Sequence, residues 1–146
     1  MSTQEHLVVI GNGMAGAKVV EEILERDRSR FRITMFGAEP YGNYNRILLS
    51  NVLNGTQDAK EIFMNPLGWY HENDITLHAG VTVTAIDRAR KTVSAVGCRL
   101  SAVDVPTDSR QPTADGFEER YDRLIIATGS RPFVPPMTTA RRHDFA

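Results

Sequence analysis

The clearest pattern in the chain is a short apolar run that ends at a glycine-rich turn and leads directly into a helical pattern. Leu7–Ile10 is continuously apolar, which is typical of a strand buried on both faces of a parallel sheet. In the residues that follow, apolar side chains recur at helical spacing and share one face. Phe31–Phe36 is a second apolar run of strand length. Together these segments predict a βαβ unit.

Further along the chain, the pattern predicts shorter elements. Turn-forming residues dominate Gly37–Asn45. The predicted elements are then a helix over Arg46–Leu53 ending at Asn54-Gly55, a short helix with Asn65 as N-cap and Pro66 as its first residue, a parallel strand over Ile75–His78, and an antiparallel hairpin of Val81–Asp87 with Thr92–Val96. We expect residues 104–119 to form a loop or insertion, and Tyr121–Thr128 to form a buried strand that stops at Gly129.

Composition narrows the function classes. The formal net charge of −1 gives no electrostatic footprint for nucleic acid or an anionic membrane. No segment is apolar enough to span a bilayer or to serve as a signal peptide, so we expect a cytoplasmic protein. Cys98 is the only cysteine, which excludes an internal disulfide and a cysteine-ligated metal or Fe–S site within one chain.

The turn itself reads Gly11-x-Gly13-x-x-Gly16, and each glycine has a physical role in binding a dinucleotide. Gly11 allows the tight turn, Gly13 lets a pyrophosphate approach the backbone, and Gly16 lets the helix pack close to the sheet. The phosphates would lie on the free N–H groups of the helix N-terminus. We therefore assign the dinucleotide contacts of the turn to Gly11, Asn12, Gly13, Met14, Ala15 and Gly16; an ordinary glycine-rich turn is the alternative.

A dinucleotide-binding fold often places an acidic residue at the end of the second strand, where it binds ribose hydroxyls. Here that position is close to Gly37, and the nearest carboxylate is Glu39, two residues later. Glu39 is thus either the ribose ligand or a solvated turn residue.

Two further segments give the chain a family resemblance: Tyr41-Gly-Asn-Tyr-Asn-Arg-Ile-Leu-Leu-Ser-Asn51 and Ala127-Thr-Gly-Ser-Arg-Pro132. With the glycine turn, they resemble the FAD-binding part of the pyridine nucleotide-disulfide oxidoreductase superfamily, the two-dinucleotide-domain flavoproteins. The first segment, with Asn65-Pro-Leu-Gly-Trp-Tyr70, is similar to the N-terminal region of the large subunit of assimilatory NAD(P)H-dependent nitrite reductases. The resemblance runs from about Leu7 to Pro136.

The resemblance implies roles for residues outside the glycine turn. Arg46 matches an arginine that reaches the flavin cofactor, for which a planar, permanently charged guanidinium is suited; a surface ion pair is the alternative. Val83 matches a strand residue whose backbone hydrogen-bonds adenine. The Ala-Thr-Gly turn, where the chain passes over the dinucleotide, adds Ala127, Thr128, Gly129 and Arg131 to the expected cofactor contacts.

The chain also departs from the superfamily pattern. The disulfide reductases carry two cysteines near the start of the helix after the second strand, and this region has none, so thiol–disulfide catalysis is excluded. Asn51 stands where related ferredoxin reductases place a lysine against the flavin, and asparagine at this position matches the nitrite reductase motif. No second glycine fingerprint appears before residue 146.

The resemblance implies an α/β fold: a three-layer Rossmann-type FAD/NAD(P)-binding domain with a parallel sheet and an antiparallel β appendage. We expect residues 1–136 to form an FAD domain, incomplete relative to the family, and residues 137–146 to be a disordered tail. The implied function is the FAD-binding portion of an NAD(P)H-dependent nitrite reductase, with FAD relaying electrons from NAD(P)H.

The expected partners are FAD and the remaining domains of a parent enzyme, with neither nucleic acid nor membrane. NAD(P)H, an Fe–S cluster and sirohaem would belong to that parent, where nitrite is reduced to ammonia, and not to this chain. Two alternatives remain: the FAD domain of a rubredoxin- or ferredoxin-type reductase, and a non-catalytic nucleotide-binding module.

Overall fold

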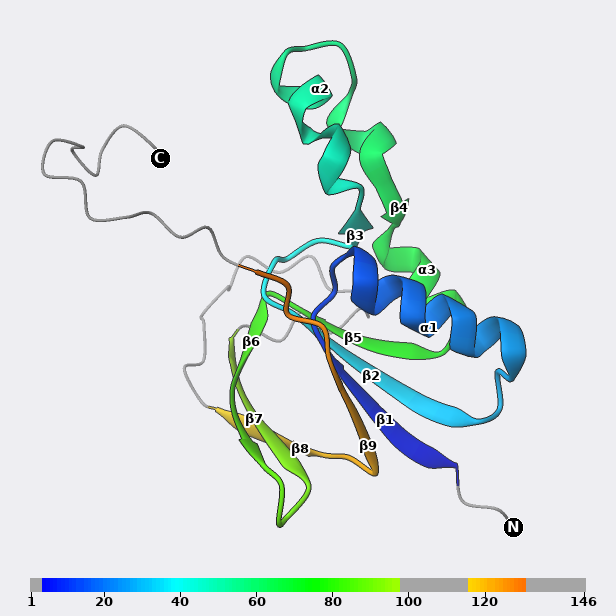
Figure 1. Ribbon diagram of the computed structural model, residues 1–146, viewed down its shortest axis with the longest axis vertical. Coiled ribbons are helices and arrows are strands. Elements are labelled where there is room, and N and C mark those ends of the chain that lie inside the picture. The colour runs from blue at the N-terminus through cyan, green and yellow to red at the C-terminus, as the bar shows by residue number, and fades with distance from the viewer. Residues whose placement is uncertain (1–3, 98–115, 131–146) are drawn as a thin grey trace, which may run out of the picture.

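The computed structural model describes residues 4–97 and 116–130. Its centre is a four-stranded parallel sheet in the order β5-β2-β1-β9 (Figure 1). The strands are β1 (Glu5–Ile10), β2 (Phe31–Gly37), β5 (Ile75–Ala79) and β9 (Arg123–Ile126). The predicted βαβ unit is confirmed, since β1 and β2 pair in parallel with Leu7 opposite Ile33.

Two further layers cover the faces of this sheet. Helices α1 (Met14–Arg26) and α3 (Leu67–Glu72) lie on one face. A three-stranded antiparallel sheet lies on the other, with strands β6 (Val81–Asp87), β7 (Thr92–Gly97) and β8 (Phe117–Arg120) in that order. The predicted three-layer α/β fold with an antiparallel appendage is thus confirmed.

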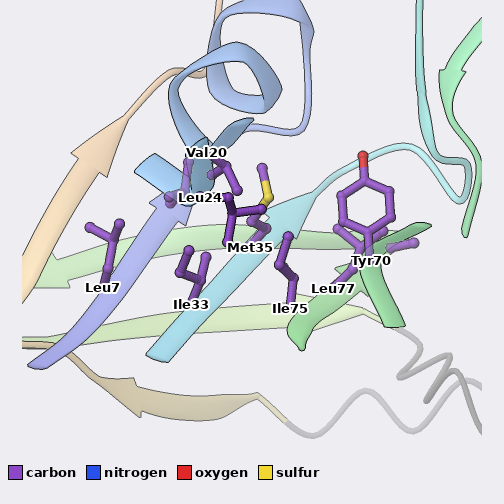
Figure 2. Packing of buried hydrophobic residues seen from close by; sticks show 10 residues of the cluster. Leu7, Val20, Leu24, Ile33, Met35, Tyr70, Ile75 and Leu77 are labelled. Carbon is purple, nitrogen blue, oxygen red and sulfur yellow. The ribbon is translucent and has the colours of Figure 1, made fainter. Parts of the chain in front are cut away.

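The continuous apolar run in β1 is explained by this layering, because successive side chains of a strand point to opposite faces. Leu7 and Val9 join the core under the helices, while Val8 and Ile10 join the core under the antiparallel sheet. Figure 2 shows the helix-side core, in which Val20 and Leu24 of α1 lie over side chains of β1, β2 and β5.

The segment between β2 and β5 projects beyond the edge of the parallel sheet (Figure 1). We call residues 43–65 the arm. It contains β3 (Asn43–Tyr44), the 3₁₀ turn η1 (Arg46–Leu48), α2 (Leu49–Leu53), the 3₁₀ turn η2 (Ala59–Ile62) and β4 (Phe63–Asn65). β3 and β4 pair in antiparallel fashion at its base.

Several sequence predictions need correction. The predicted helix over Arg46–Leu53 is a 3₁₀ turn followed by a short α-helix, in which no side chain is buried and so no apolar face is anchored. The short helix starts one residue later than predicted, because Asn65 ends β4 and Pro66 is the N-cap.

The end of the predicted 104–119 loop is also wrong, since residues 117–119 belong to β8 and pair with β7. β9 is shorter than predicted and only partly buried, with Ile126 61% exposed, because it is the outer strand of the sheet in the described part of the chain. Cys98, most of the predicted loop and the predicted tail at 137–146 lie outside the described residues. The limits of the predicted 1–136 domain stay a prediction.

Candidate functional site

The glycine turn lies where the carboxyl ends of three parallel strands meet. The Gly11 N–H, directly after β1, donates to the Phe36 carbonyl of β2 at 2.8 Å. The Ala127 N–H, directly after β9, donates to the Ile10 carbonyl at 2.7 Å. Open α/β sheets bind their ligands in the crevice at this end of the strands, so the turn has the position expected of a ligand site.

Two of the three glycines are required by the protein itself. Gly11 has a φ of +115°, and a Cβ there would collide with the carbonyl oxygen of Ala127. A Cβ on Gly16 would collide with the carbonyl oxygen of Gly11. The turn, the first turn of α1 and the residue after β9 are therefore packed backbone against backbone.

Gly13 is different, because a Cβ at this position would meet no atom of the described protein within 4 Å. Its φ of −85° is open to any residue. Gly13 is the N-cap of α1, where no side chain caps the helix and the first turn carries no acidic residue. The first N–H groups of a helix lack intrahelical partners and carry its positive field, so a dinucleotide pyrophosphate fits this opening.

The other predicted residues of the turn are Asn12, Met14 and Ala15, and they differ in their contacts with the protein. Met14 and Ala15 are exposed in the first turn of α1. The Asn12 side chain is instead held by the protein: its Oδ1 accepts a hydrogen bond from the Tyr70 hydroxyl at 2.7 Å, and its Nδ2 donates to the Tyr41 carbonyl at 3.4 Å. Both polar groups of the Asn12 side chain are thus bonded within the protein.

Ala127 and Thr128 lie beside the glycine turn, since a Cβ on Gly11 would lie 3.0 Å from the Thr128 nitrogen. Ala127 packs on the turn, and its Cβ would lie 3.5 Å from a Cβ on Gly16. Thr128 is exposed, and Gly129 has a φ of +73° with open space around it. Arg131 lies outside the described residues.

Glu39, predicted to bind ribose, and Arg46, predicted to bind the flavin cofactor, form an ion pair with each other. Arg46, at the start of η1, donates to Glu39 at 2.9 Å, and its guanidinium lies 5.4 Å from the ring centre of Tyr44. Partial burial raises the pKa of Tyr44, and its hydrogen bond to Glu39 acts in the same direction. The Arg46 and Glu39 side chains are 56% and 45% exposed, so both can be reached by a ligand.

Val83 lies in β6, in the antiparallel layer, opposite Ala95 of β7. Its side chain packs against the core on that face of the parallel sheet. In the described residues β6 is an edge strand, and the alternate backbone groups of an edge strand point away from its neighbour. The Gly80 N–H before β6 donates to the Glu39 carbonyl at 3.0 Å, which connects this layer to the loop after β2.

Sequence reasoning assigned Tyr70 no role in the site and used it only within a short helix and within the segment that resembles the nitrite reductases. The side chain is fully buried, and its hydroxyl reaches the glycine turn. A tyrosine on an apolar helix face gives no sequence signal of its hydrogen-bond partner, because the partner is 58 residues away. Within residues 4–97 and 116–130, no three His, Cys, Asp or Glu side chains lie together so that they could hold a metal ion. No helix in these residues is long and apolar enough to cross a membrane.

Comparison with known proteins places this chain in a family. Residues 5–145 match the model of the pyridine nucleotide-disulphide oxidoreductase family. Over 94% of its length the chain is 45% identical to nitrite reductase [NAD(P)H] of Bacillus subtilis (strain 168) and 40% identical to the assimilatory nitrate reductase electron transfer subunit of the same organism. The chain spans 15% of the length of each relative.

The fold also matches solved structures. The crystal structure of a covalent putidaredoxin reductase–putidaredoxin complex superimposes with a TM-score of 0.74 and 26% identity, covering 93% of this chain and 28% of the other. These matches confirm the resemblance found in the sequence. The chain belongs to the pyridine nucleotide-disulphide oxidoreductase family.

Proposed function

We propose that this chain binds FAD as the FAD-binding portion of an NAD(P)H-dependent oxidoreductase. The observation that carries the proposal is the contrast within the glycine turn. Gly11 and Gly16 are fixed by contacts inside the protein, whereas Gly13 faces open space at an uncapped helix N-terminus. Open space at the N-cap of α1, at the carboxyl end of β1, fits a pyrophosphate that approaches the backbone there.

The residues around the turn fit the parts of such a cofactor. The pyrophosphate would lie against the backbone N–H groups of residues 12–15. Glu39 would accept hydrogen bonds from ribose hydroxyls, and Arg46, freed from Glu39, would offer its fork to a phosphate or a flavin carbonyl. The Val83 backbone would meet adenine at the open edge of β6, and the chain from Ala127 to Gly129 would pass over the dinucleotide.

FAD, when bound, supplies the ability to accept a hydride and pass on single electrons. In this proposal the described residues bind and orient the cofactor, and none of them is assigned a catalytic step. The parent activity we propose is nitrite reduction with NAD(P)H, in nitrate assimilation, on the strength of the 45% and 40% identities to the two Bacillus subtilis proteins. NAD(P)H, an Fe–S cluster and sirohaem would then be bound by other domains, and a cytoplasmic location stays a prediction.

A second candidate is the FAD domain of a ferredoxin- or rubredoxin-type reductase, favoured by the similarity to putidaredoxin reductase. Its identity of 26% is well below that of the nitrite reductase relative, and Asn51 departs from the lysine of ferredoxin reductases. We therefore prefer the nitrite reductase type.

The proposal is tested by substituting Gly13→Val and titrating the protein with FAD, following the quenching of flavin fluorescence. The isopropyl group would fill the space for the pyrophosphate and weaken binding by about a hundredfold, equivalent to about 3 kcal/mol. Far-ultraviolet circular dichroism should stay unchanged, because no protein atom lies within 4 Å of the new Cβ.

The matched control is Gly68→Val on α3. A Cβ on Gly68 also meets no atom within 4 Å, so any general effect of adding valine is reproduced away from the turn. This variant should bind FAD as the unmodified chain does. Undiminished FAD affinity in Gly13→Val would refute the site.

A further inference from the structure

We propose that Tyr70 is a positioning residue for the dinucleotide site: its buried hydroxyl fixes the side chain of Asn12, and through it ties the glycine turn to the arm. This inference deepens the proposed function and rests on it. The FAD contacts themselves are not assigned to Tyr70, which acts only through its neighbours.

Tyr70 combines a buried ring with a hydroxyl that leaves the core. The side chain, which α3 carries, is 1% exposed and packs with Leu77 in the helix-side core. Figure 2 shows the hydroxyl pointing away from the labelled apolar side chains. It donates to Asn12 Oδ1 at 2.7 Å and accepts from the Asn43 N–H at 3.2 Å. One oxygen therefore bonds both to the glycine turn and to β3, the first strand of the arm.

The bond to Asn12 decides the orientation of the central residue of the turn. With Oδ1 held by Tyr70, the amide nitrogen of Asn12 is directed to the Tyr41 carbonyl. The Asn12 side chain also packs closely on Gly37 at the end of β2. A Cβ added to Gly37 would lie only 2.9 Å from the Asn12 Cβ. Asn12 stands between Gly11 and Gly13, so fixing its side chain fixes the backbone that would meet the pyrophosphate.

The bond to Asn43 continues into a buried chain of amides that returns to α1. Asn43 Nδ2 donates to Asn65 Oδ1 at 3.0 Å, and Asn65 Nδ2 donates to Glu21 Oε1 of α1 at 3.0 Å. Asn43 and Asn65 are 1% and 3% exposed. These bonds join β3, β4 and α1, although Asn43 Oδ1 itself accepts no hydrogen bond in the described residues.

This network has a consequence for binding. Arg46 begins η1 on the arm, two residues after the end of the β3 strand that Tyr70 holds. The pyrophosphate position lies on the glycine turn. Tyr70 thus links the two halves of the proposed site. Burial raises the pKa of Tyr70, so the hydroxyl keeps its proton and remains a donor to Asn12 near neutral pH.

The test is the variant Tyr70→Phe, which keeps the ring and removes only the oxygen. The dissociation constant and dissociation rate of FAD are measured by flavin fluorescence, in buffer where the variant is fully folded. We expect FAD to bind about tenfold more weakly, chiefly through faster dissociation. A merely structural role would lower the unfolding midpoint and leave the affinity of the folded protein unchanged.

A double-mutant cycle shows whether Tyr70 acts through Asn12. Asn12→Ala removes the other partner without touching the buried ring, and it should weaken FAD binding to a similar extent. The double variant should then bind no more weakly than Asn12→Ala alone. If Tyr70→Phe does not fold, unchanged FAD affinity in Asn12→Ala overturns the inference by itself.

The control is Tyr121→Phe, which removes a tyrosine hydroxyl on the opposite face of the parallel sheet. It should leave FAD binding unchanged. Failure of the unmodified chain to bind FAD would overturn the proposed function, and this inference with it. Normal binding by the unmodified chain with unchanged binding in Tyr70→Phe and Asn12→Ala, or equal losses in Tyr121→Phe, would overturn the inference alone.

Discussion

The parallel sheet and the arm are stabilised in opposite ways. In β1 and β2, the side chains of Val8, Val9 and Met35 are completely buried. In the arm, Ile47 is 73% exposed and Leu53 is 87% exposed. The sheet is therefore held by the removal of apolar surface from water, which is the dominant favourable term in folding, whereas the arm has little of it.

Local polar contacts take its place in the arm. Asn45 Oδ1 accepts from the Ile47 N–H at 3.0 Å, and Asp58 Oδ1 accepts from the Lys60 N–H at 2.8 Å. Such bonds join residues two apart and give the arm turns without a core. Regions with few buried apolar contacts open at lower free energy, so the arm should be the less stable part of the proposed site. The difference teaches that the site depends on the base of the arm, where the buried amides of Asn43 and Asn65 connect the arm to the rest of the protein.

The largest expected effect lies in the sheet. Met35→Ala should lower the free energy of unfolding by about 2–5 kcal/mol, because it removes a fully buried side chain and leaves a cavity. Leu53→Ala in the arm, the matched control, should change it by no more than about 0.5 kcal/mol. Urea unfolding followed by circular dichroism measures both, and equal losses would erase the contrast between the two regions.

The second largest effect should come from a substitution at the base of the arm. Asn65→Ala removes the buried bonds to Asn43 and Glu21, leaving polar groups unpaired at a cost of about 1–3 kcal/mol. Because the loss falls at the base of the arm, proteolysis of residues 43–65 should accelerate more than cleavage elsewhere. Glu61→Ala, at an exposed position of the arm, should behave like the unmodified chain. Unchanged protection in Asn65→Ala would show that the buried amides do not hold the arm.

Acid should weaken the sheet through His6, which is 5% exposed in β1. Burial, and next the charge of Arg32, lower the pKa of His6; Glu119 and Asp122 act in the opposite direction. The ring nitrogen also lies 2.9 Å from the Thr34 hydroxyl. The unfolded chain therefore binds the proton more readily, and stability present above about pH 6.5 falls as the pH drops below it.

For one proton this slope is at most about 1.4 kcal/mol per pH unit. Urea midpoints at pH 7.5 and 5.5 measure it, with His6→Gln expected to reduce the difference. His71→Gln, at an exposed position of α3, should retain the full difference. A difference as large in His6→Gln as in the unmodified chain would assign the acid sensitivity to other groups.

The smallest effect should come from the ion pair between Glu39 and Arg46. Both side chains are about half exposed, and pairs of this kind contribute about 0–1 kcal/mol. Glu39→Gln should therefore change the free energy of unfolding by less than about 0.5 kcal/mol at 0.15 M salt and by less still at 1 M. A loss well above 1 kcal/mol would mean that this pair, and not the buried amides, holds the arm in place.

Much of the fold follows from local patterns. The strands from Leu7 and Phe31 were predictable as apolar runs of strand length, and the helix between them and the hairpin starting at Val81 from their apolar periodicity. β8 was not, since Phe117–Arg120 is mostly charged and becomes a strand only by pairing with β7. The residues of the proposed FAD site were predicted as a set, and their roles toward a cofactor stay predictions.

The sequence by itself determined the βαβ unit and the glycine turn, because apolar periodicity and the conformational freedom of glycine act over a few residues. Only the tertiary structure decided which glycines the protein needs for its own packing, that Glu39 forms an ion pair with Arg46, and that the Tyr70 hydroxyl hydrogen-bonds the Asn12 side chain. The first and third are contacts between residues far apart in the chain, and the second joins two exposed side chains across a turn. Such contacts depend on the path of the backbone in space, which no local pattern encodes.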